Sequence, residues 1–451
     1  MSTLLTSDRA TARVPRYTSY PTAPHFNAGV SAKTVMKWLE ATAADEPLSL
    51  YAHIPFCDSL CWFCGCHMRV VNTYTPVAAY ADVLLREIGM VAAALKTRRP
   101  VAHIHFGGGS PTILRPRDIA RIAEALHTLF DIRPGAEFAV EIDPRGLSDE
   151  TIEAFARASV TRASLGVQDV NPRVQAAVNR IQPLDVTQSA VDRLRAAGIT
   201  ALNIDLMYGL PHQTIEDVKR TVEAAVAMAP QRFAVFGYAH VPEMKRHQAL
   251  IDAAALPGGE ERMRQVEAVH ALLTASGYVA IGLDHFARAN DPLAIALAQG
   301  RLKRNFQGYT TDDAATLIGF GASAISSLPQ GYAQNVVDIP EYRRLILGGE
   351  LATARGRALT GDDRLRRAVI ERLMCDLAVD VEAIAIQHGA NGTDFAAAFD
   401  ALQPLVAEGI CTINGTKVTV PPQARAGVRL VCAAFDAYLH PQASARHAVA
   451  V

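Results

Sequence analysis

Between about residues 48 and 280 the chain alternates short apolar runs with amphipathic helical patterns. Helical periodicity occupies residues 80–95, 116–130, 149–158, 183–197 and 215–228. The short runs are rich in β-branched and aromatic residues: LSLYAHIPF, VAHIHFGGGSPT, EFAVEIDP, TRASLGVQD, ITALNIDLMYGLP and QRFAVFGYAHVP. Such alternation indicates parallel β/α units. We therefore predict an α/β protein built on a partial (β/α)6 barrel like a TIM barrel, which the later run YVAIGLDHFA could extend.

The two ends of the chain differ from this central region. Residues 1–45 form a Pro- and Tyr-containing arm with one helical stretch at residues 31–43. Residues 351–451 are Ala- and Arg-rich helical patterns followed by the short β-like run TKVTV. We predict three parts: an arm that closes over the barrel as a lid (1–45), the barrel (46–350) and a mainly helical, winged-helix-like C-terminal domain (351–451).

Composition excludes several classes of partner. The 44 Lys and Arg residues balance 45 Asp and Glu residues, so nothing indicates a nucleic acid or an anionic membrane as partner. No apolar run reaches the roughly 18 residues of a membrane span, and the N-terminus lacks a secretory signal. Of seven cysteines, four lie within ten residues, which favours a reducing compartment over a disulfide framework. We expect a cytoplasmic monomer.

The clustered cysteines are Cys57, Cys61, Cys64 and Cys66 in the string CDSLCWFCGC, directly after the first predicted strand. Soft thiolates suit an iron–sulfur cluster or zinc. Structural zinc usually takes pairs of ligands from separated knuckles, and the chain has no second CxxC motif. The other cysteines, at positions 375, 411 and 432, are isolated, and we expect them to be buried apolar residues.

Polar and glycine-rich residues gather where later strands end, which is where the active sites of β/α barrels lie. The glycines of FGGGSPT let backbone amides approach a ligand closely, although a tight β/α turn would explain them as well. Glu141 and Asp205 each end a predicted strand and could bind amine or hydroxyl groups. The alternative for each carboxylate is a helix cap.

The CxxxCxxC spacing at the top of a β/α barrel resembles the radical SAM superfamily. The resemblance implies that Cys57, Cys61 and Cys64 bind three irons of a [4Fe–4S] cluster and that the fourth iron stays open for S-adenosylmethionine. It implies reductive cleavage of that cofactor to methionine and a 5′-deoxyadenosyl radical. Cys66 is then not a ligand.

A closer resemblance covers nearly the whole chain. The strings PRYTSYPTA, YAHIPFC, CGC, GVQD, VNR, NIDLMYGLP, YAHVP, DHFAR, RNFQGYTT and GASAIS are similar to those of the oxygen-independent coproporphyrinogen III oxidases. The resemblance implies oxidative decarboxylation of the ring A and B propionates of coproporphyrinogen III to vinyl groups, which gives protoporphyrinogen IX in haem synthesis. It also implies two bound S-adenosylmethionine molecules and an electron donor such as flavodoxin or ferredoxin.

Residue roles follow from the resemblance by position. The first S-adenosylmethionine is expected to contact Tyr51, Gly108, Glu141 and Ile325. The second is expected to contact Phe63, Gly109, Ser110, Gln168, Arg180, Asp205 and Ala239, with Ser110 standing where the family usually has Thr. The expected catalytic residues are Cys66, Glu141 and Gln307. Phe63 could instead simply shield the cluster.

The substrate carries four carboxylates, for which guanidinium groups are natural partners. The candidates are Arg13 and Arg16 in the arm, together with Arg288 and Arg304. Three rival functions stay open: a related haem chaperone, which generally lacks the fourth cysteine and the RYTSYP string, a haem-processing or methyl-transferring enzyme, and a non-enzymatic zinc scaffold.

Overall fold

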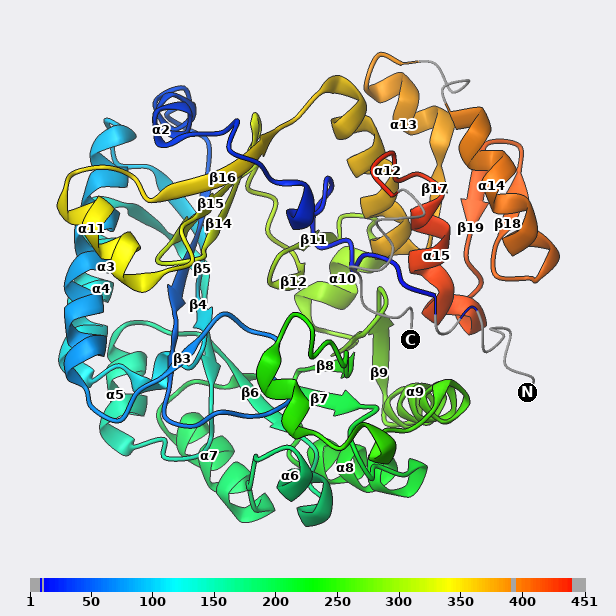
Figure 1. Cartoon of the computed structure of the whole chain (residues 1–451), viewed down its shortest axis with the longest axis horizontal. Helices are drawn as coiled ribbons and strands as arrows, with labels where there is room; N and C mark the ends of the chain where they lie inside the picture. The colour runs from blue at the N-terminus through cyan, green and yellow to red at the C-terminus, as the bar shows by residue number, and fades with distance from the viewer. Residues whose placement is uncertain (1–8, 10–11, 391–394, 440–451) are drawn as a thin grey trace.

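Six parallel strands form the centre of the molecule in this computed structural model, which describes residue 9 and residues 12–390 and 395–439 (Figure 1). They lie side by side in chain order: β1 (Leu48–Ile54), β4 (Pro100–Gly108), β5 (Asp131–Ile142), β6 (Arg162–Gln168), β7 (Ala201–Tyr208) and β8 (Arg232–Gly237). Every neighbouring pair from β1 to β8 is parallel. The predicted partial (β/α)6 barrel is therefore confirmed.

Helices cover the outside of this sheet at the predicted places: α3 (Thr75–Ala94), α4 (Pro116–Leu129), α5 (Asp149–Arg157), α7 (Leu184–Ala196) and α8 (Ile215–Ala227). A short helix, α6 (Pro172–Ala177), follows β6, and α9 (Gly259–Ala275) follows β8. Side-chain caps start several of them. Ser148 accepts a hydrogen bond from the Thr151 amide, and Thr214 forms a capping box with Asp217.

The sheet continues beyond the parallel strands on both sides. On one side β13 (Thr316–Phe320) runs parallel to β1, followed by antiparallel β14 (Ile325–Leu328), β15 (Gly331–Asn335) and β16 (Thr353–Ala358). On the other side β10 (His285–Arg288) and β9 (Tyr278–Ile281) form the extension predicted from YVAIGLDHFA, as an antiparallel hairpin. The strand order ends at β16 on one side and at β9 on the other, and these two strands do not pair, so the barrel is open. Strand β16 lies past the boundary predicted at residue 350.

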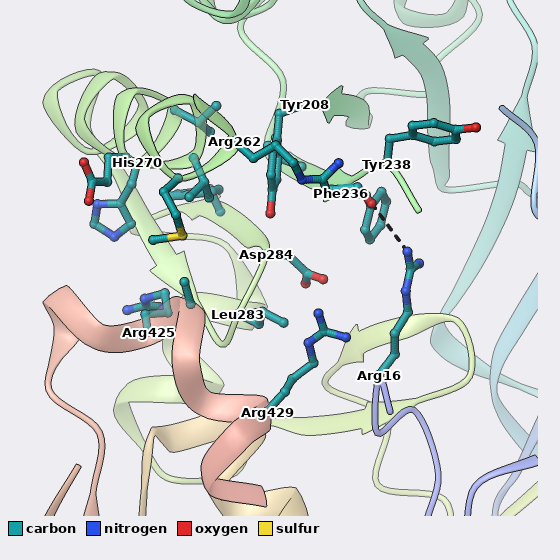
Figure 2. A pocket seen from close by; sticks show the side chains of 18 of the residues that line it. Arg16, Tyr208, Phe236, Tyr238, Arg262, His270, Leu283, Asp284, Arg425 and Arg429 are labelled. Atoms are coloured by element: carbon teal, nitrogen blue, oxygen red, sulfur yellow. Dashed lines mark hydrogen bonds between the residues drawn. The ribbon is translucent and has the colours of Figure 1, made fainter. Parts of the chain in front are cut away.

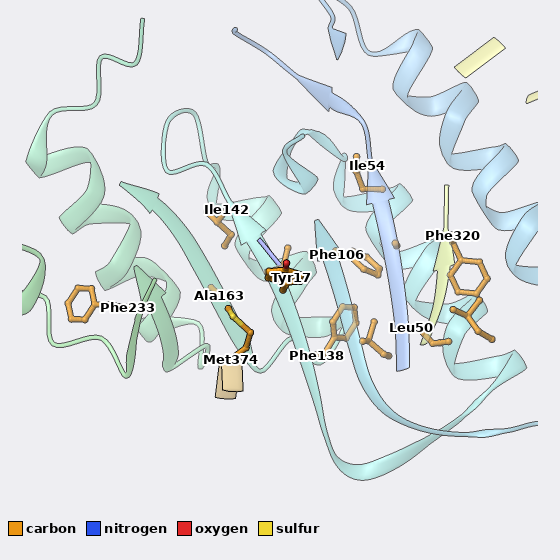
Figure 3. Close-up of a cluster of buried hydrophobic side chains, with 14 of the residues drawn as sticks. Tyr17, Leu50, Ile54, Phe106, Phe138, Ile142, Ala163, Phe233, Phe320 and Met374 are labelled. Atoms are coloured by element: carbon orange, nitrogen blue, oxygen red, sulfur yellow. The ribbon is translucent and has the colours of Figure 1, made fainter. Parts of the chain in front are cut away.

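Side chains that alternate in direction along the strands separate an apolar layer, between the sheet and the helices, from the polar interior of the barrel. Phe106 and Phe138 are at most 3% exposed, and their rings meet edge to face with centroids 4.9 Å apart in the layer between sheet and helices (Figure 3). Their neighbours along the same strands, His105 and Glu137, line the inside of the barrel. A period of two thus sends apolar groups toward the helices and polar groups into the barrel.

The C-terminal part combines helices with a small sheet. It contains α12 (Gly361–Asp376), α13 (Val381–Gln387), α14 (Ala396–Ala407) and α15 (Val428–Ala433). Strands β17 (Ala378–Asp380), β19 (Lys417–Thr419) and β18 (Thr412–Asn414) pair antiparallel in that order, and β19 falls in the predicted TKVTV run. Helices followed by a β-hairpin match the predicted winged-helix-like arrangement.

The arm crosses between the C-terminal helices and the barrel before it reaches α2 (Ala32–Glu40) (Figure 1). Tyr17 and Tyr20 are at most 4% exposed. The Tyr17 hydroxyl donates to Asp436 at 3.1 Å, and the Tyr20 hydroxyl accepts from the Ala437 amide at 2.9 Å. These contacts join the arm to the C-terminal part, and the Tyr332 hydroxyl of β15 donates to the Tyr20 carbonyl oxygen at 3.2 Å. Residues 1–8, 10 and 11 of the arm lie outside the described residues. No helix in the described ranges is long and apolar enough to cross a membrane.

Candidate active site

The cysteine loop leaves the barrel at the carboxyl end of β1, after the short strand β2 (Phe56–Cys57). Cys61 is buried, Cys57 and Cys64 are half-buried and Cys66 is exposed. Each of the chain's seven cysteines is a free thiol. The loop is therefore anchored at the barrel mouth and presents several reduced sulfurs there, as the predicted cluster requires.

The segment that follows β8 holds the cysteine loop by its backbone. A ring nitrogen of His247 lies 2.7 Å from the carbonyl oxygen of Cys64, and the Gln248 amide donates to the carbonyl of Phe63 at 3.0 Å. Gln248 is itself 1% exposed. Buried polar contacts of this kind fix the path of the loop without occupying its sulfurs.

The thiols influence one another strongly. Burial and the neighbouring thiols raise the pKa of Cys57 to about 12, whereas a hydrogen bond from Cys66 lowers the pKa of Cys64 to about 7. The described residues hold no three His, Cys, Asp or Glu side chains grouped closely enough for a single metal ion. A cubane cluster takes one thiolate on each of three separate irons, which is the donor set of this loop.

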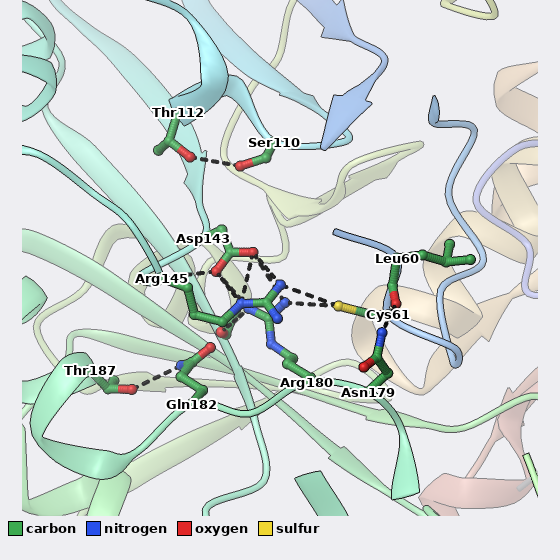
Figure 4. Close-up of polar contacts among 11 residues, drawn as sticks. Leu60, Cys61, Ser110, Thr112, Asp143, Arg145, Asn179, Arg180, Gln182 and Thr187 are labelled. Atoms are coloured by element: carbon green, nitrogen blue, oxygen red, sulfur yellow. Dashed lines mark hydrogen bonds and ion pairs between the residues drawn. The ribbon is translucent and has the colours of Figure 1, made fainter. Parts of the chain in front are cut away.

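Two guanidinium groups converge on Cys61 (Figure 4). Arg145 and Arg180 each approach its sulfur at 3.4 Å, and both also contact Asp143, at 2.6 Å from Arg145 and 3.4 Å from Arg180. Burial disfavours the Asp143 carboxylate, but hydrogen bonds from Arg145 and the charge of Arg180 outweigh burial and lower its pKa. Two positive charges against one carboxylate favour an anionic sulfur ligand at this position.

The glycines that end β4 let two side chains approach the backbone closely. A Cβ atom on Gly107 would fall 2.7 Å from Glu141 Oε1, and one on Gly108 would fall 2.7 Å from the His53 ring. Gly108 also has a φ of +118°, which L side chains rarely adopt. Glu141 accepts hydrogen bonds from the Gly108 amide at 3.0 Å and from His105 at 3.2 Å. These glycines are therefore required for a close approach and do more than shape a turn.

A cavity of about 210 Å³ lies inside the barrel and brings together Tyr51, Glu141, Asp205 and Gln307. Gln307 Oε1 is buried without a hydrogen-bond partner, as is the oxygen of Asn203 in the same lining. Burial, followed by repulsion from Glu141, raises the pKa of Asp205 to about 6 against hydrogen bonds from Ser164 and Asn203. Orphaned acceptors and a carboxylate with a raised pKa are typical of a site that binds a ligand.

The other predicted cofactor-contact residues lie outside the lining of this cavity. Phe63 packs in a cluster with Tyr238, and Ala239 follows at the end of β8. Gln168 has a φ of +69°, and its side chain meets that of Arg180 over Gly166. Ser110 is 7% exposed and its hydroxyl lies 2.7 Å from that of Thr112, while Ile325 begins β14.

The arginines predicted for substrate carboxylates divide into two pairs. Arg16 and Arg304 both line a second, larger cavity beside the barrel. Arg13 instead pairs with Glu243 at 3.7 Å. Arg288 stacks on the Tyr278 ring at 4.0 Å and donates to the carbonyl oxygen of Ser276 at 3.2 Å. Arg16 and Arg304 therefore face one cavity, whereas these partners of Arg13 and Arg288 lie outside its lining.

Some site residues were missed in the sequence. Arg145 follows Asp143 and Pro144 directly after β5. Its position just past a strand end could have identified this charged residue as part of the site. Arg262 on α9 and Arg429 on α15 line the larger cavity together with Arg16. Those three residues come from distant parts of the chain, and no local pattern joins them.

Comparisons with known proteins agree with this geometry. Residues 51–225 match the Radical SAM superfamily, whose cofactors are a [4Fe–4S] cluster and S-adenosylmethionine, and residues 359–426 match the HemN C-terminal domain. The oxygen-independent coproporphyrinogen III oxidase of Bradyrhizobium diazoefficiens is 49% identical over 95% of both chains. The protein of that name from Escherichia coli is 39% identical over 95% of this chain and 94% of its own.

A solved structure shows the same fold over nearly the full length. It is described as coproporphyrinogen III oxidase (HemN) from Escherichia coli, a radical SAM enzyme, and it matches with a TM-score of 0.89 and 38% identity. The match covers 94% of this chain and 98% of that one. On the strength of near-complete coverage by such relatives, together with the thiol loop and the glycine strand end, the chain belongs to the oxygen-independent coproporphyrinogen III oxidases of the radical SAM superfamily.

Proposed function

We propose that this chain oxidatively decarboxylates the ring A and B propionates of coproporphyrinogen III to vinyl groups and so produces protoporphyrinogen IX. The single observation that carries the proposal is the cavity inside the barrel, which Tyr51, Glu141 and Asp205 line. It occurs in a chain that has a loop of free thiols after β1 and is related throughout its length to oxidases of that name. The same relatives favour the oxidase over the haem chaperone and the haem-processing alternative.

Cys57, Cys61 and Cys64 are the proposed ligands of the cluster. The arginine pair on Cys61 supports this assignment because it compensates an anionic sulfur. Cys66 is exposed beside Cys64, with its amide 3.4 Å from the Cys64 sulfur. An exposed position next to the ligands suits a role toward the substrate, which we assign to Cys66.

The two S-adenosylmethionine molecules are assigned to adjoining sets of residues. Tyr51, Gly108, Glu141 and Ile325 hold the first. The Glu141 carboxylate, which accepts a hydrogen bond from the Gly108 amide at 3.0 Å, suits the amino group of its methionine part. Phe63, Gly109, Ser110, Gln168, Arg180, Asp205 and Ala239 hold the second.

When bound, the cofactors would supply a 5′-deoxyadenosyl radical for the removal of one hydrogen atom from a propionate, after which carbon dioxide would leave and one electron would pass to an acceptor. The chain positions the reactants and excludes water. Arg162 and Arg232 begin β6 and β8, at the end of the barrel opposite the cysteine loop. Arg162 pairs with Glu137 at 2.8 Å, and Arg232 pairs with Asp291 at 2.8 Å. Gln307, in the turn between β11 (Lys303–Asn305) and β12 (Gly308–Thr310), presents its amide toward the interior.

We also propose a location, an oligomeric state, an electron donor and a role for each part of the chain. The chain acts as a cytoplasmic monomer, takes electrons from a flavodoxin or ferredoxin, and uses residues 1–45 as a lid over the barrel (46–350), beside a C-terminal domain (351–451). Seven free thiols support a reducing compartment. The buried packing of Tyr17 and Tyr20 supports an arm that covers the site.

The test is anaerobic reconstitution with iron and sulfide, followed by mass spectrometry of a reaction with coproporphyrinogen III, a reductant and S-adenosylmethionine. We expect two successive losses of carbon dioxide and the formation of 5′-deoxyadenosine. Tight haem binding without cleavage of S-adenosylmethionine would overturn the proposal in favour of the chaperone. A reconstituted protein that holds zinc and no iron would overturn it in favour of a scaffold.

A further inference from the structure

The cavity beside the barrel has a volume of about 530 Å³ and is rich in arginine. Its walls come mainly from four places: the ends of β7 and β8, helix α9, the arm, and the start of α15. Among the described residues, five arginines line it against two carboxylates, those of Asp284 and Glu267. Such an imbalance in a cavity of ligand-binding size points to an anionic ligand.

The arginines face a common space (Figure 2). The guanidinium groups of Arg16, Arg262 and Arg429 turn toward the centre of the cavity around Asp284. Arg16 donates to the carbonyl oxygen of Gly237 at 3.4 Å, and Arg429 donates to that of Val14 at 3.3 Å. Both acceptors are neutral carbonyl oxygens, and these two hydrogen bonds orient the side chains.

Two further arginines in the cavity walls have buried N–H groups without a hydrogen-bond partner. Arg304 lies 3.8 Å from Asp284, yet its Nε and Nη1 atoms are buried without a hydrogen bond. Arg425 donates to the carbonyl oxygen of Gly282, and its Nε is likewise unpartnered. Burial, followed by repulsion from Arg16, lowers the pKa of Arg429 to about 10. Together these features indicate an excess of positive charge in the cavity walls.

Apolar surface fills the space between the arginines. Tyr208, Phe236, Met263, Val266 and Phe286 are among the lining residues. Flat apolar walls with cations at the edges suit a ligand that has an apolar ring system and peripheral carboxylates. The cavity also adjoins the radical site, because Phe236 borders the barrel cavity too and Tyr238 belongs to the hydrophobic cluster against which Phe63 of the cysteine loop packs.

We propose that this arginine cavity binds the carboxylates of the tetrapyrrole that are not decarboxylated, and that it anchors the ring while the reacting edge extends toward the barrel. The inference rests on the proposed function. It assigns Arg262, Arg425 and Arg429 as binding residues beside Arg16 and Arg304. An anchor on the retained propionates serves both decarboxylations, because those groups are present in substrate and product alike.

The test is a binding experiment on the reconstituted holoenzyme with coproporphyrin III, a fluorescent and air-stable form of the substrate ring. Arg262→Met is compared with Arg264→Met, which lies on the same helix but pairs with Glu261 at the surface. We expect Arg262→Met and Arg429→Met each to weaken binding by about tenfold or more, as loss of a charged hydrogen bond does. Arg264→Met should stay within about twofold of the unaltered protein.

Three further measurements distinguish a loss of carboxylate contacts from a general loss of binding. The tetramethyl ester of coproporphyrin III should bind equally to all variants, the number of bound S-adenosylmethionine molecules should not change, and Arg262→Lys should lose less affinity than Arg262→Met. Equal coproporphyrin affinity in Arg262→Met, Arg429→Met and Arg264→Met would overturn the cavity assignment. Variants that bind S-adenosylmethionine less well would overturn it too, because the cavity would then hold that cofactor. If the unaltered holoenzyme neither binds nor converts the tetrapyrrole, the proposed function itself fails.

Discussion

The Nη2 atom of Arg145 lies 3.4 Å from the sulfur of Cys61, in a position where the guanidinium also pairs with Asp143 at 2.6 Å. A hydrogen bond to a ligand sulfur stabilises the more negative, reduced state of a cluster. Replacing Arg145 should therefore lower the reduction potential of the cluster without removing a ligand.

For Arg145→Met we expect the midpoint potential to fall by about 30–60 mV, which corresponds to about 0.7–1.4 kcal/mol for one electron. Redox titration followed by electron paramagnetic resonance measures it. Arg157→Met is the control, since Arg157 is exposed on α5 and pairs with Glu153 one turn away on the same helix. A potential that is the same in both variants would show that Arg145 does not act on the cluster.

Gly107 is predicted to tolerate no side chain. A Cβ there would lie 2.7 Å from Glu141, so Gly107→Ala should displace the carboxylate and weaken S-adenosylmethionine binding by about tenfold, since overpacking costs about 1–3 kcal/mol. Equilibrium dialysis measures the affinity. In Gly89→Ala the new methyl meets nothing within 4 Å, and we expect unchanged binding with about 0.5–1 kcal/mol of added helix stability. Equal affinities in the two variants would refute the close approach.

Asp205 should make binding of the second S-adenosylmethionine depend on pH. Its pKa is raised to about 6, chiefly by burial and then by Glu141, with His285 opposing. If only the carboxylate accepts from the ligand, affinity is nearly maximal at pH 7.5, is halved near pH 6 and falls further as the pH drops, by about fourfold from pH 7.5 to 5.5. Stoichiometric binding assays over this range give the profile. Asp205→Asn should bind weakly with a flat profile, and an unaltered slope in that variant would assign the titration to another group.

Cys66 is predicted to matter for turnover and not for the cluster. Cys66→Ser should keep the full iron content and lose product formation by about a hundredfold or more, as expected for a group that acts directly on a reactant. Iron analysis and product chromatography on the same sample separate the two effects. Cys61→Ser serves as contrast and should lose iron. If Cys66→Ser also loses iron, Cys66 is a ligand and the open iron site must be reconsidered.

Much of the barrel could be predicted because its strands carry their information locally. In β1 and β5 alternate residues face helices or interior, and runs such as EFAVEIDP show that alternation plainly. Strands β13 to β16 were not anticipated. They are short, rich in Gly and Ser, and acquire their partners only through the edge that β1 provides.

The residues of the site also differ in how well the sequence could predict them. Cys57, Cys61 and Cys64 are neighbours in sequence, so their spacing alone indicated shared chemistry. Arg262 and Arg429 reach the arginine cavity from helices that are far apart in the chain, and their role depends on how the C-terminal domain and the arm pack on the barrel. Long-range packing of this kind leaves no local pattern.

The proposed function requires radical chemistry from the cysteine loop to remove the propionate carboxyl groups. Coproporphyrinogen III that carries deuterium on the β-carbons of its propionates tests this requirement. We predict that deuterium appears in 5′-deoxyadenosine in step with vinyl formation by the reconstituted enzyme. Vinyl formation with unlabelled 5′-deoxyadenosine would contradict the account, because the hydrogen would then leave by a route other than the radical formed at this site.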